Sequence, residues 1–274
     1  MKILIATDME GISGVVSWDQ VTPGHFEYAR FRKIYTAEVN AAILGAFEGG
    51  AQEIILTDGH DEGYNILLEE LDPRAHLNSG LATAPLSMMQ GIDETCDAVI
   101  FLGYHARAGS ELAVLDHTWN EQILNVWLNE TLVGEFGLNA ALAGHFGVPI
   151  IMVTGDQTAC SQTAELIGDL EQVVVKEATG RFSALCRPVE AAQAAVREGA
   201  RHALRRLKEG QIPGPWVVAA PVRLAVEFRK SDQADRAMRY PDSKREGTRV
   251  AVTAPDMRAA YVSFRSIAAL GSGG

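Results

Sequence analysis

Four short apolar runs, each continuous rather than alternating with polar residues, constrain the fold of this chain most strongly. They cover residues 3–6, 53–57, 98–102 and 148–153. Strands that are apolar on both faces are typical of a parallel sheet covered by helices on both sides. Stretches with helical spacing lie between these runs, including residues 37–47, which end at the helix-terminating pair Gly49-Gly50. The sequence therefore predicts an α/β fold with a mostly parallel sheet and flanking helices, a Rossmann-like three-layer core.

One segment interrupts this alternation. Residues 122–128 and 131–133 flank Asn129 and Glu130, which is the pattern of a hairpin with a two-residue turn. Further along, we expect helices over residues 188–208 and 256–270, strands over residues 216–228 and 249–253, and a flexible tail over residues 271–274. These patterns favour an α/β core over residues 1–180 and a smaller C-terminal α+β module over residues 181–274.

Composition and charge exclude several classes of protein. Hydrophobic residues make up 47% and charged residues 22%, as in ordinary globular proteins, and the net charge is −11. An acidic chain is poorly suited to nucleic acid or to an anionic membrane, and no apolar run approaches the ~20 residues of a membrane span. The cysteines 96, 160 and 186 show no disulfide or zinc-ribbon spacing. Since the N-terminal apolar run is too short for an export signal, we expect a cytoplasmic protein.

Acidic residues and histidines follow three of the predicted strands. Asp8 and Glu10 come directly after the first strand, His60 after the second and His105 after the third. Ligand sites in open parallel sheets lie at the carboxyl ends of the strands. A single pair of carboxylates is more often solvated or a backbone cap than a metal site, and a lone histidine is more often structural than a ligand. The coincidence at three strands favours a metal site.

The residue types narrow the choice of metal. Carboxylates and imidazoles without thiolates suit zinc, manganese, iron or cobalt. Glu135, after the hairpin, adds a carboxylate, and three carboxylates with a bridging hydroxide would balance two divalent ions. His117 is a sixth ligand, a general acid or base, a donor to a developing oxyanion, or a hydrogen-bonded loop histidine. The sequence lacks a serine-hydrolase elbow, a dinucleotide fingerprint and a phosphate-binding loop.

The motifs around these residues resemble a known family, the binuclear zinc D-aminopeptidases associated with dipeptide transport operons. The resemblance rests on residues 8–14 (DMEGISG), 58–60 (DGH), 103–107 (GYHAR) and 134–140 (GEFGLNA), which occur in the family's order and spacing. It extends from residue 1 to about residue 156, and beyond that only the length and the pattern match.

The resemblance implies a site and an activity. It implies that Asp8 bridges two Zn²⁺ ions, that Glu10 and His60 complete the shell of one ion, and that His105 and Glu135 complete the other. His117 is then the catalytic histidine, and a bridging hydroxide hydrolyses small peptides with an N-terminal D-amino acid, such as D-Ala-D-Ala. Co²⁺ or Mn²⁺ would also suit these ligands. The resemblance further implies a homodecamer that takes short peptides as substrates.

Two positions depart from the family pattern, and two other functions remain open. Asp116 precedes His117 where the family usually has serine, and a carboxylate within ~4–6 Å would raise the pKa of that histidine. Gln157 stands where the family often has aspartate. The chain could be another binuclear metallohydrolase acting on an amide or a phosphate ester, although Arg107 is the sole cation within the motifs. A non-catalytic protein that binds metal or peptide is the third possibility.

Overall fold

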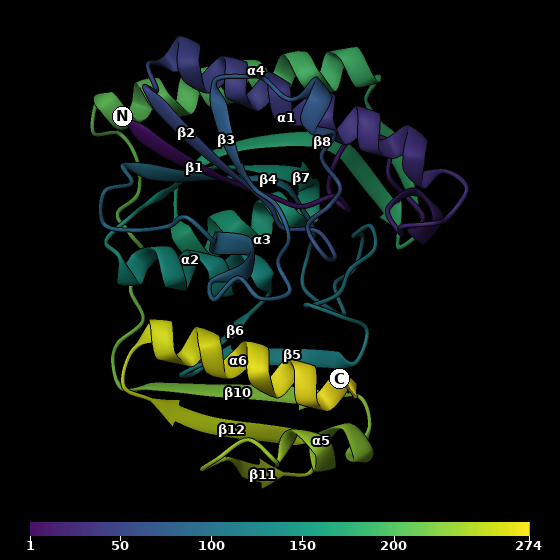
Figure 1. Cartoon of the computed structure of the whole chain (residues 1–274), viewed down its shortest axis with the longest axis vertical. Helices are drawn as coiled ribbons and strands as arrows, with labels where there is room; N and C mark the ends of the chain where they lie inside the picture. Colours follow the sequence, from purple (N-terminus) through teal and green to yellow (C-terminus); the bar gives the residue numbers. More distant parts are fainter. Residues whose placement is uncertain (274) are drawn as a thin grey trace.

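The computed structural model describes residues 1–273 and contains two sheets, each with its own helices (Figure 1). The first sheet has seven strands in the order β3-β2-β1-β4-β7-β8-β9. All neighbours in it are parallel except β9, which runs antiparallel to β8. Its strands are β1 (Lys2–Thr7), β2 (Glu53–Asp58), β3 (Ala75–Asn78), β4 (Ala98–Tyr104), β7 (Ile150–Asp156), β8 (Glu171–Gly180) and β9 (Ser183–Cys186). The predicted mostly parallel sheet is confirmed.

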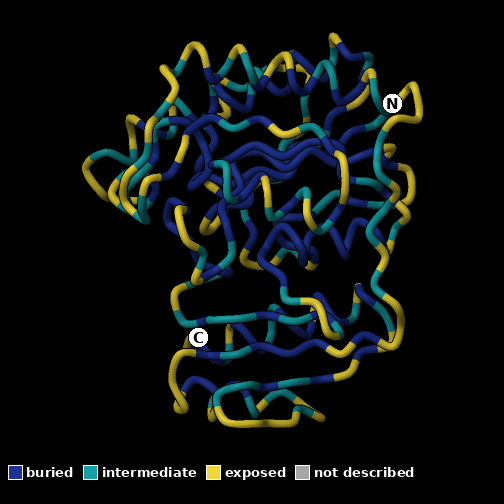
Figure 2. Tube along the Cα trace, turned by 180° about the vertical axis from the view of Figure 1, so that it is seen from behind, coloured by how far each residue is buried: buried dark blue, intermediate teal, exposed yellow. Residues whose placement is uncertain are grey.

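Helices cover both faces of this sheet. The helices α1 (Tyr28–Gly49) and α4 (Val189–Lys208) pack together on one face, and α2 (Glu135–His145) and α3 (Gln157–Ile167) lie on the other (Figure 1). Alternate β1 residues enter different clusters, Ile3 and Ile5 on one side and Leu4 and Ala6 on the other. The central strands are accordingly buried along their length (Figure 2). This is the three-layer core that the continuous apolar runs predict.

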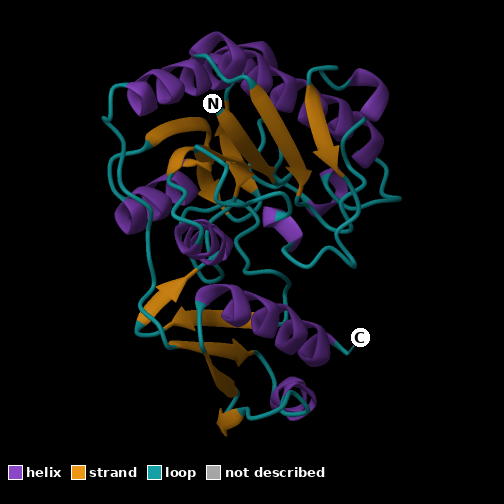
Figure 3. Ribbon diagram, turned by 60° about the vertical axis from the view of Figure 1, so that its left-hand side comes forward, coloured by secondary structure: helices purple, strands orange, loops and turns teal. Residues whose placement is uncertain are grey.

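The second sheet is antiparallel and has the order β11-β12-β10-β5-β6. The predicted hairpin is present, and Asn129 in its turn adopts a φ of 53°. Helix α6 packs on β10 and β12, lies between this sheet and α2, and contacts α5 (Figures 1 and 3). The elements are β5 (Ile123–Leu128), β6 (Thr131–Val133), β10 (Val222–Phe228), α5 (Ser231–Ala237), β11 (Lys244–Glu246), β12 (Arg249–Ala254) and α6 (Met257–Ser272). Three short 3₁₀ helices complete the secondary structure: η1 (Trp18–Gln20), η2 (Leu68–Glu70) and η3 (Ser87–Met89).

Three of the element boundaries that differ from the sequence predictions have a clear physical reason. Helix α1 begins nine residues before residue 37, because its first turns bury the aromatic residues Phe31 and Tyr35. The strand expected from residue 216 begins only at Val222, just after Pro221, which has no N–H to donate to a ladder. The expected tail is helical through Ser272, because Gly271 packs against the ring of Phe228; Gly274 lies outside the described residues.

The division of the chain near residue 180 stays a prediction, and the two sheets do not follow it along the sequence. The hairpin β5–β6 pairs with β10 in the second sheet, whereas α4 packs on α1 and on the first sheet. Within residues 1–273, no helix combines the length and the hydrophobicity needed to cross a membrane.

Candidate metal centre

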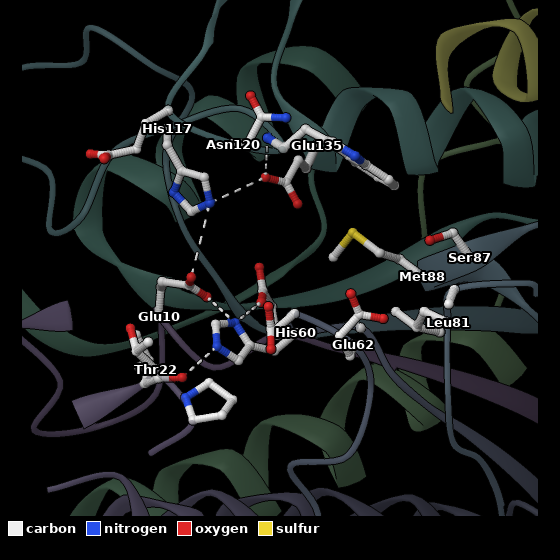
Figure 4. A pocket seen from close by; sticks show the side chains of 18 of the residues that line it. Glu10, Thr22, His60, Glu62, Leu81, Ser87, Met88, His117, Asn120 and Glu135 are labelled. Atoms are coloured by element: carbon white, nitrogen blue, oxygen red, sulfur yellow. Dashed lines mark hydrogen bonds and ion pairs between the residues drawn. The ribbon is translucent and has the colours of Figure 1, made fainter. Parts of the chain in front are cut away.

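The five predicted metal ligands converge at the carboxyl edge of the parallel sheet. Asp8 and Glu10 follow β1, His60 follows β2, His105 follows β4, and Glu135 is the first residue of α2. All five are buried, none with more than 7% of its surface exposed. Figure 4 shows Glu10 and His60 facing Glu135 and His117 across a pocket. The crossover connections thus bring together residues that are far apart in the sequence.

The two carboxylate oxygens of Asp8 face two different histidines. Its Oδ1 lies 3.3 Å from Nδ1 of His60, and its Oδ2 lies 3.4 Å from Nε2 of His105. Glu10 stands beside His60, with 2.9 Å between Oε2 and Nδ1. Glu135 stands beside His105, with 3.1 Å between Oε1 and Nε2. The site therefore consists of two halves that share Asp8.

Backbone carbonyls fix which nitrogen of each histidine faces the carboxylates. Nε2 of His60 donates to the carbonyl of Val21 at 2.8 Å, which leaves Nδ1 toward the cluster. Nδ1 of His105 donates to the carbonyl of Ala106 at 3.0 Å, which leaves Nε2 of this histidine toward the cluster. Metal-binding histidines usually donate their other N–H in this way, which fixes the tautomer and presents a lone pair to the ion.

The loops that carry the ligands are held by close backbone contacts. The N–H of Gly11 donates to the carbonyl of Gly103 at 2.7 Å, and a Cβ at Gly11 would lie 2.1 Å from the carbonyl oxygen of Tyr104. Only glycine permits this approach between the β1 and β4 loops. The turn after β2 is fixed by Asn65, whose side chain donates to Asp58 and to the carbonyl of His60.

Burial and mutual charge shift the pKa values of the cluster. Burial, with repulsion from Glu10, raises the pKa of Asp8 to about 8. Burial acts to raise the pKa of Glu10, but the neighbouring His60 outweighs it and holds that pKa well below its usual range. Burial likewise acts to lower the pKa of His105, but Glu135 and Asp8 raise it to about 10. The charged forms of Glu10 and His105 are thus stabilised by their partners, whereas that of Asp8 is destabilised.

The donor set fits a divalent cation. Oε2 of Glu10 and Nε2 of His105 are buried without a hydrogen bond of acceptable geometry, although both lie near oppositely charged partners. One ligand atom each from Asp8, Glu10 and His105 lies within 4.8 Å of the others, as do atoms from His105, His117 and Glu135. A bound cation would satisfy these atoms, and the mix of imidazole and carboxylate suits zinc, as it suits manganese, iron or cobalt.

His117 joins the cluster at a longer range. Its Nδ1 donates to the carbonyl of Leu115 at 2.8 Å, so that Nε2 faces Glu10 at 3.9 Å and Glu135 at 3.7 Å. Its ring stacks on that of His105 and meets the edge of Trp18. Burial and the neighbouring His105 lower the pKa of His117. A neutral imidazole beside two carboxylates can accept a proton at Nε2.

The cluster forms the floor of a cavity of about 500 Å³. Its walls come from the loops after β1, β2 and β3, from the segment before β5, and from Arg265 of α6. Trp18 and Arg265 also line this cavity and were not predicted to do so, since neither belongs to a recognisable motif. Arg265 donates to the carbonyls of Leu81 and Ala84, which joins the second sheet's helix to the cavity wall.

The two departures from the family pattern fasten the loop that carries His117. Asp116 accepts from the N–H of Gly109 at 2.7 Å, and its Oδ1 lies 3.0 Å from Nε of Arg181. The amide of Gln157 donates to the carbonyl of Leu112 and accepts from the N–H of Ala178. The pKa of His117 is lowered rather than raised, and the carboxylate of Asp116 is paired with Arg181.

Comparison with known proteins agrees with this geometry. The sequence model of the M55 peptidase family, described as D-aminopeptidase, matches residues 1–266. The chain is 36% identical over 264 residues to a D-aminopeptidase of Bacillus subtilis (strain 168), covering 95% of this chain and 94% of that protein. It is also similar to a solved structure described as the Zn-dependent D-aminopeptidase DppA from Bacillus subtilis, a self-compartmentalizing protease. The TM-score is 0.96 at 33% identity, over 100% of this chain and 99% of the other.

Proposed function

This chain belongs to the M55 family of D-aminopeptidases, and from that membership we infer that it is a metal-dependent aminopeptidase that uses zinc. The single observation that carries this function to particular residues is the pair of histidines facing opposite oxygens of Asp8. A carboxylate so placed can serve two cations at once. The function therefore rests on the family together with the geometry of one side chain.

We propose that each chain holds two Zn²⁺ ions. Glu10 and His60 would complete the shell of one ion, and His105 and Glu135 the shell of the other, with Asp8 between them. This assignment is supported by the short distances within each half and by the carbonyls that orient the two imidazoles. Co²⁺ or Mn²⁺ would suit the same ligands.

The chain's own residues would divide the remaining work of peptide hydrolysis. When bound, zinc ions activate water near neutral pH and polarise a carbonyl. His117 would accept a proton at Nε2 and return it to the leaving amine, because its Nδ1–H is held by the carbonyl of Leu115. The acidic side chains of Asp61 and Glu62, which line the cavity and are not proposed ligands, would favour a substrate that presents a free, positively charged amine. Trp18, beside His117, would limit the access of bulk water.

We propose short peptides with an N-terminal D-amino acid, such as D-Ala-D-Ala, as the substrates. The preference for a D-residue is supported by the names of the similar proteins, and a cavity of about 500 Å³ is of the size that takes small ligands. The cavity lining offers one arginine and no lysine among the described residues. That arginine donates to two backbone carbonyls, which disfavours the phosphate-ester alternative.

Hydrolysis assays test this proposal directly. The purified protein would be incubated with D-Ala-D-Ala and with L-Ala-L-Ala, as isolated, after chelation, and after zinc is added back. We expect cleavage of the D-dipeptide that is lost with the metal and restored with zinc. Cleavage of p-nitrophenyl phosphate in place of both peptides would support the alternative hydrolase. Zinc binding without any cleavage would support the non-catalytic alternative.

We also propose that the protein assembles as a homodecamer. The similar solved structure is described as self-compartmentalizing, which supports an oligomer. Light scattering on the purified protein gives the mass directly, and a mass other than ten chains would overturn the proposed number.

A further inference from the structure

A lysine lies buried beneath the first ligand loop, and the proposed mechanism does not use it. Lys176 is in the middle of β8 and only 1% of its surface is exposed. Its ammonium donates to three backbone carbonyls, those of Glu10 at 2.5 Å, Ile12 at 3.0 Å and Val15 at 2.8 Å. All three acceptors belong to the loop after β1. The three hydrogens of the ammonium are thereby matched to three acceptors in one short segment.

These contacts are aimed at the backbone rather than at an acidic side chain. Among residues 1–273, no carboxylate oxygen lies within 4.0 Å of Nζ of Lys176. Two buried acids lie further off: Asp156, the neighbour of Lys176 in the parallel register, and Glu38 of α1, which accepts from the N–H of Ser13 in the same loop at 3.1 Å. Burial of an ammonium costs free energy even when its hydrogen bonds are satisfied, and an apolar residue at this position would avoid that cost. The presence of a lysine therefore indicates a specific role.

The loop is clamped from two sides at Glu10. On one side, the N–H of Gly11 donates to the carbonyl of Gly103 in β4. On the other, Lys176 holds the carbonyl of Glu10 itself. The carbonyl of Glu10 and the N–H of Gly11 belong to one peptide unit, which is therefore held at both ends, and the carboxylate of Glu10 leaves the loop toward His60. Removal of the ammonium would free three carbonyls and let this ligand side chain move.

We propose that Lys176 is a positioning residue for metal binding, which holds the loop of residues 10–15 so that Glu10 is placed to act as a ligand. This inference rests on the proposed zinc site. It assigns to β8, which supplies none of the proposed ligands, a direct part in forming the site. Residues that support metal ligands typically change metal affinity by about 10–100-fold when they are replaced.

The experiment measures zinc affinity in four proteins by competition with a chromophoric chelator. They are the parent, Lys176→Met, Glu38→Gln and the double variant, each titrated from the metal-free form at one pH. We expect Lys176→Met to weaken binding at one zinc equivalent by about tenfold or more. The double variant also removes the charge of Glu38, so it decides the question if the single variant fails to fold. It should remain about tenfold weaker than the parent.

A matched control and three outcomes separate the alternatives. Lys2→Met makes the same substitution at the far end of β1, where the ammonium contacts Asp93 and Thr95, and its zinc affinity should equal that of the parent. If the double variant regained the parent's affinity, Lys176 would be only a counter-ion for Glu38, and the inference would be overturned. Unchanged affinity in Lys176→Met would also overturn it. A parent that binds less than one zinc would overturn the proposed metal site and this inference with it.

Discussion

The imidazole rings of His105 and His117 stack with their centroids 3.9 Å apart and their planes 11° apart. Two imidazolium ions would repel each other strongly at this distance, so the environment has to give the rings different charges. Glu135 and Asp8 raise the pKa of His105 to about 10 against the effect of burial, whereas burial and His105 lower the pKa of His117. One ring is thus suited to a ligand role and the other to proton transfer, in the way that environment separates paired catalytic groups elsewhere.

Replacement of His117 should separate catalysis from metal binding. We expect His117→Ala to lower kcat by about 10²-fold or more, the range for general acid–base groups, while zinc content stays at the parent's value. Steady-state kinetics and metal analysis on the same preparation check this. His145→Ala, on the exposed side of α2, is the matched control and should keep full activity. A parallel loss of zinc would make His117 a ligand instead.

Asp8→Asn should remove metal as well as activity. The amide keeps the shape of the side chain but loses the charge that each half of the site shares, so both halves are weakened. We expect less than half of the parent's zinc after gel filtration, with activity reduced in proportion. Asp61→Asn, an exposed residue of the same cavity, should retain its zinc. Two zinc equivalents in Asp8→Asn would show that another residue joins the halves.

Zinc affinity should rise with pH. In the metal-free protein the pKa of His105 is raised to about 10 and that of Asp8 to about 8, so both hold protons at pH 7 that zinc must displace. Below these pKa values each displaced proton makes the apparent affinity about tenfold stronger per pH unit. Chelator competition at pH 6.5, 7.0 and 7.5, with calorimetry in two buffers to count released protons, checks this. An affinity independent of pH would contradict it.

Arg181 should influence turnover without contacting the metal ligands. Its guanidinium pairs with Asp116 and donates to the carbonyl of the same residue, next to His117. We expect Arg181→Met to lower kcat by about tenfold, because small displacements of a reacting group are costly, with zinc content unchanged. Arg187→Met, exposed and nearby in sequence, is the control. If kcat remained equal to the parent's, the loop would be held adequately by Gln157 and Asp156 alone.

The ligand positions could be predicted because the sheet itself brings them together. A continuous apolar run marks a buried parallel strand, and the residue after it lies at the edge where sites form. Asp8, His60 and His105 each follow such a run directly. Glu135 follows the predicted hairpin and is the first residue of a helix, so its place in the order of elements could also be predicted from the sequence. Parallel topology thus converts positions along the chain into positions in space.

Other features depend on contacts that leave no local pattern. Strand β8 was not predicted, because Lys176 in its middle interrupts the continuous apolar run that marks a buried strand. The pairing of β5 with β10 joins segments on opposite sides of β7, α3 and α4 in the sequence. The role of Asp116 could not be predicted either, because its partner Arg181 comes from the turn between β8 and β9.

The placement of β5 and β6 also determines the stage of synthesis at which the second sheet can form. The hairpin is made well before β10, yet β10 is the strand that covers the open edge of β5. An open strand edge is a site for wrong pairing, and growing chains order their N-terminal parts first. Arg265 of α6, which holds one wall of the cavity, is made later still. We therefore expect a nascent chain to form its parallel sheet on the ribosome and to become active only after the last helix has been released.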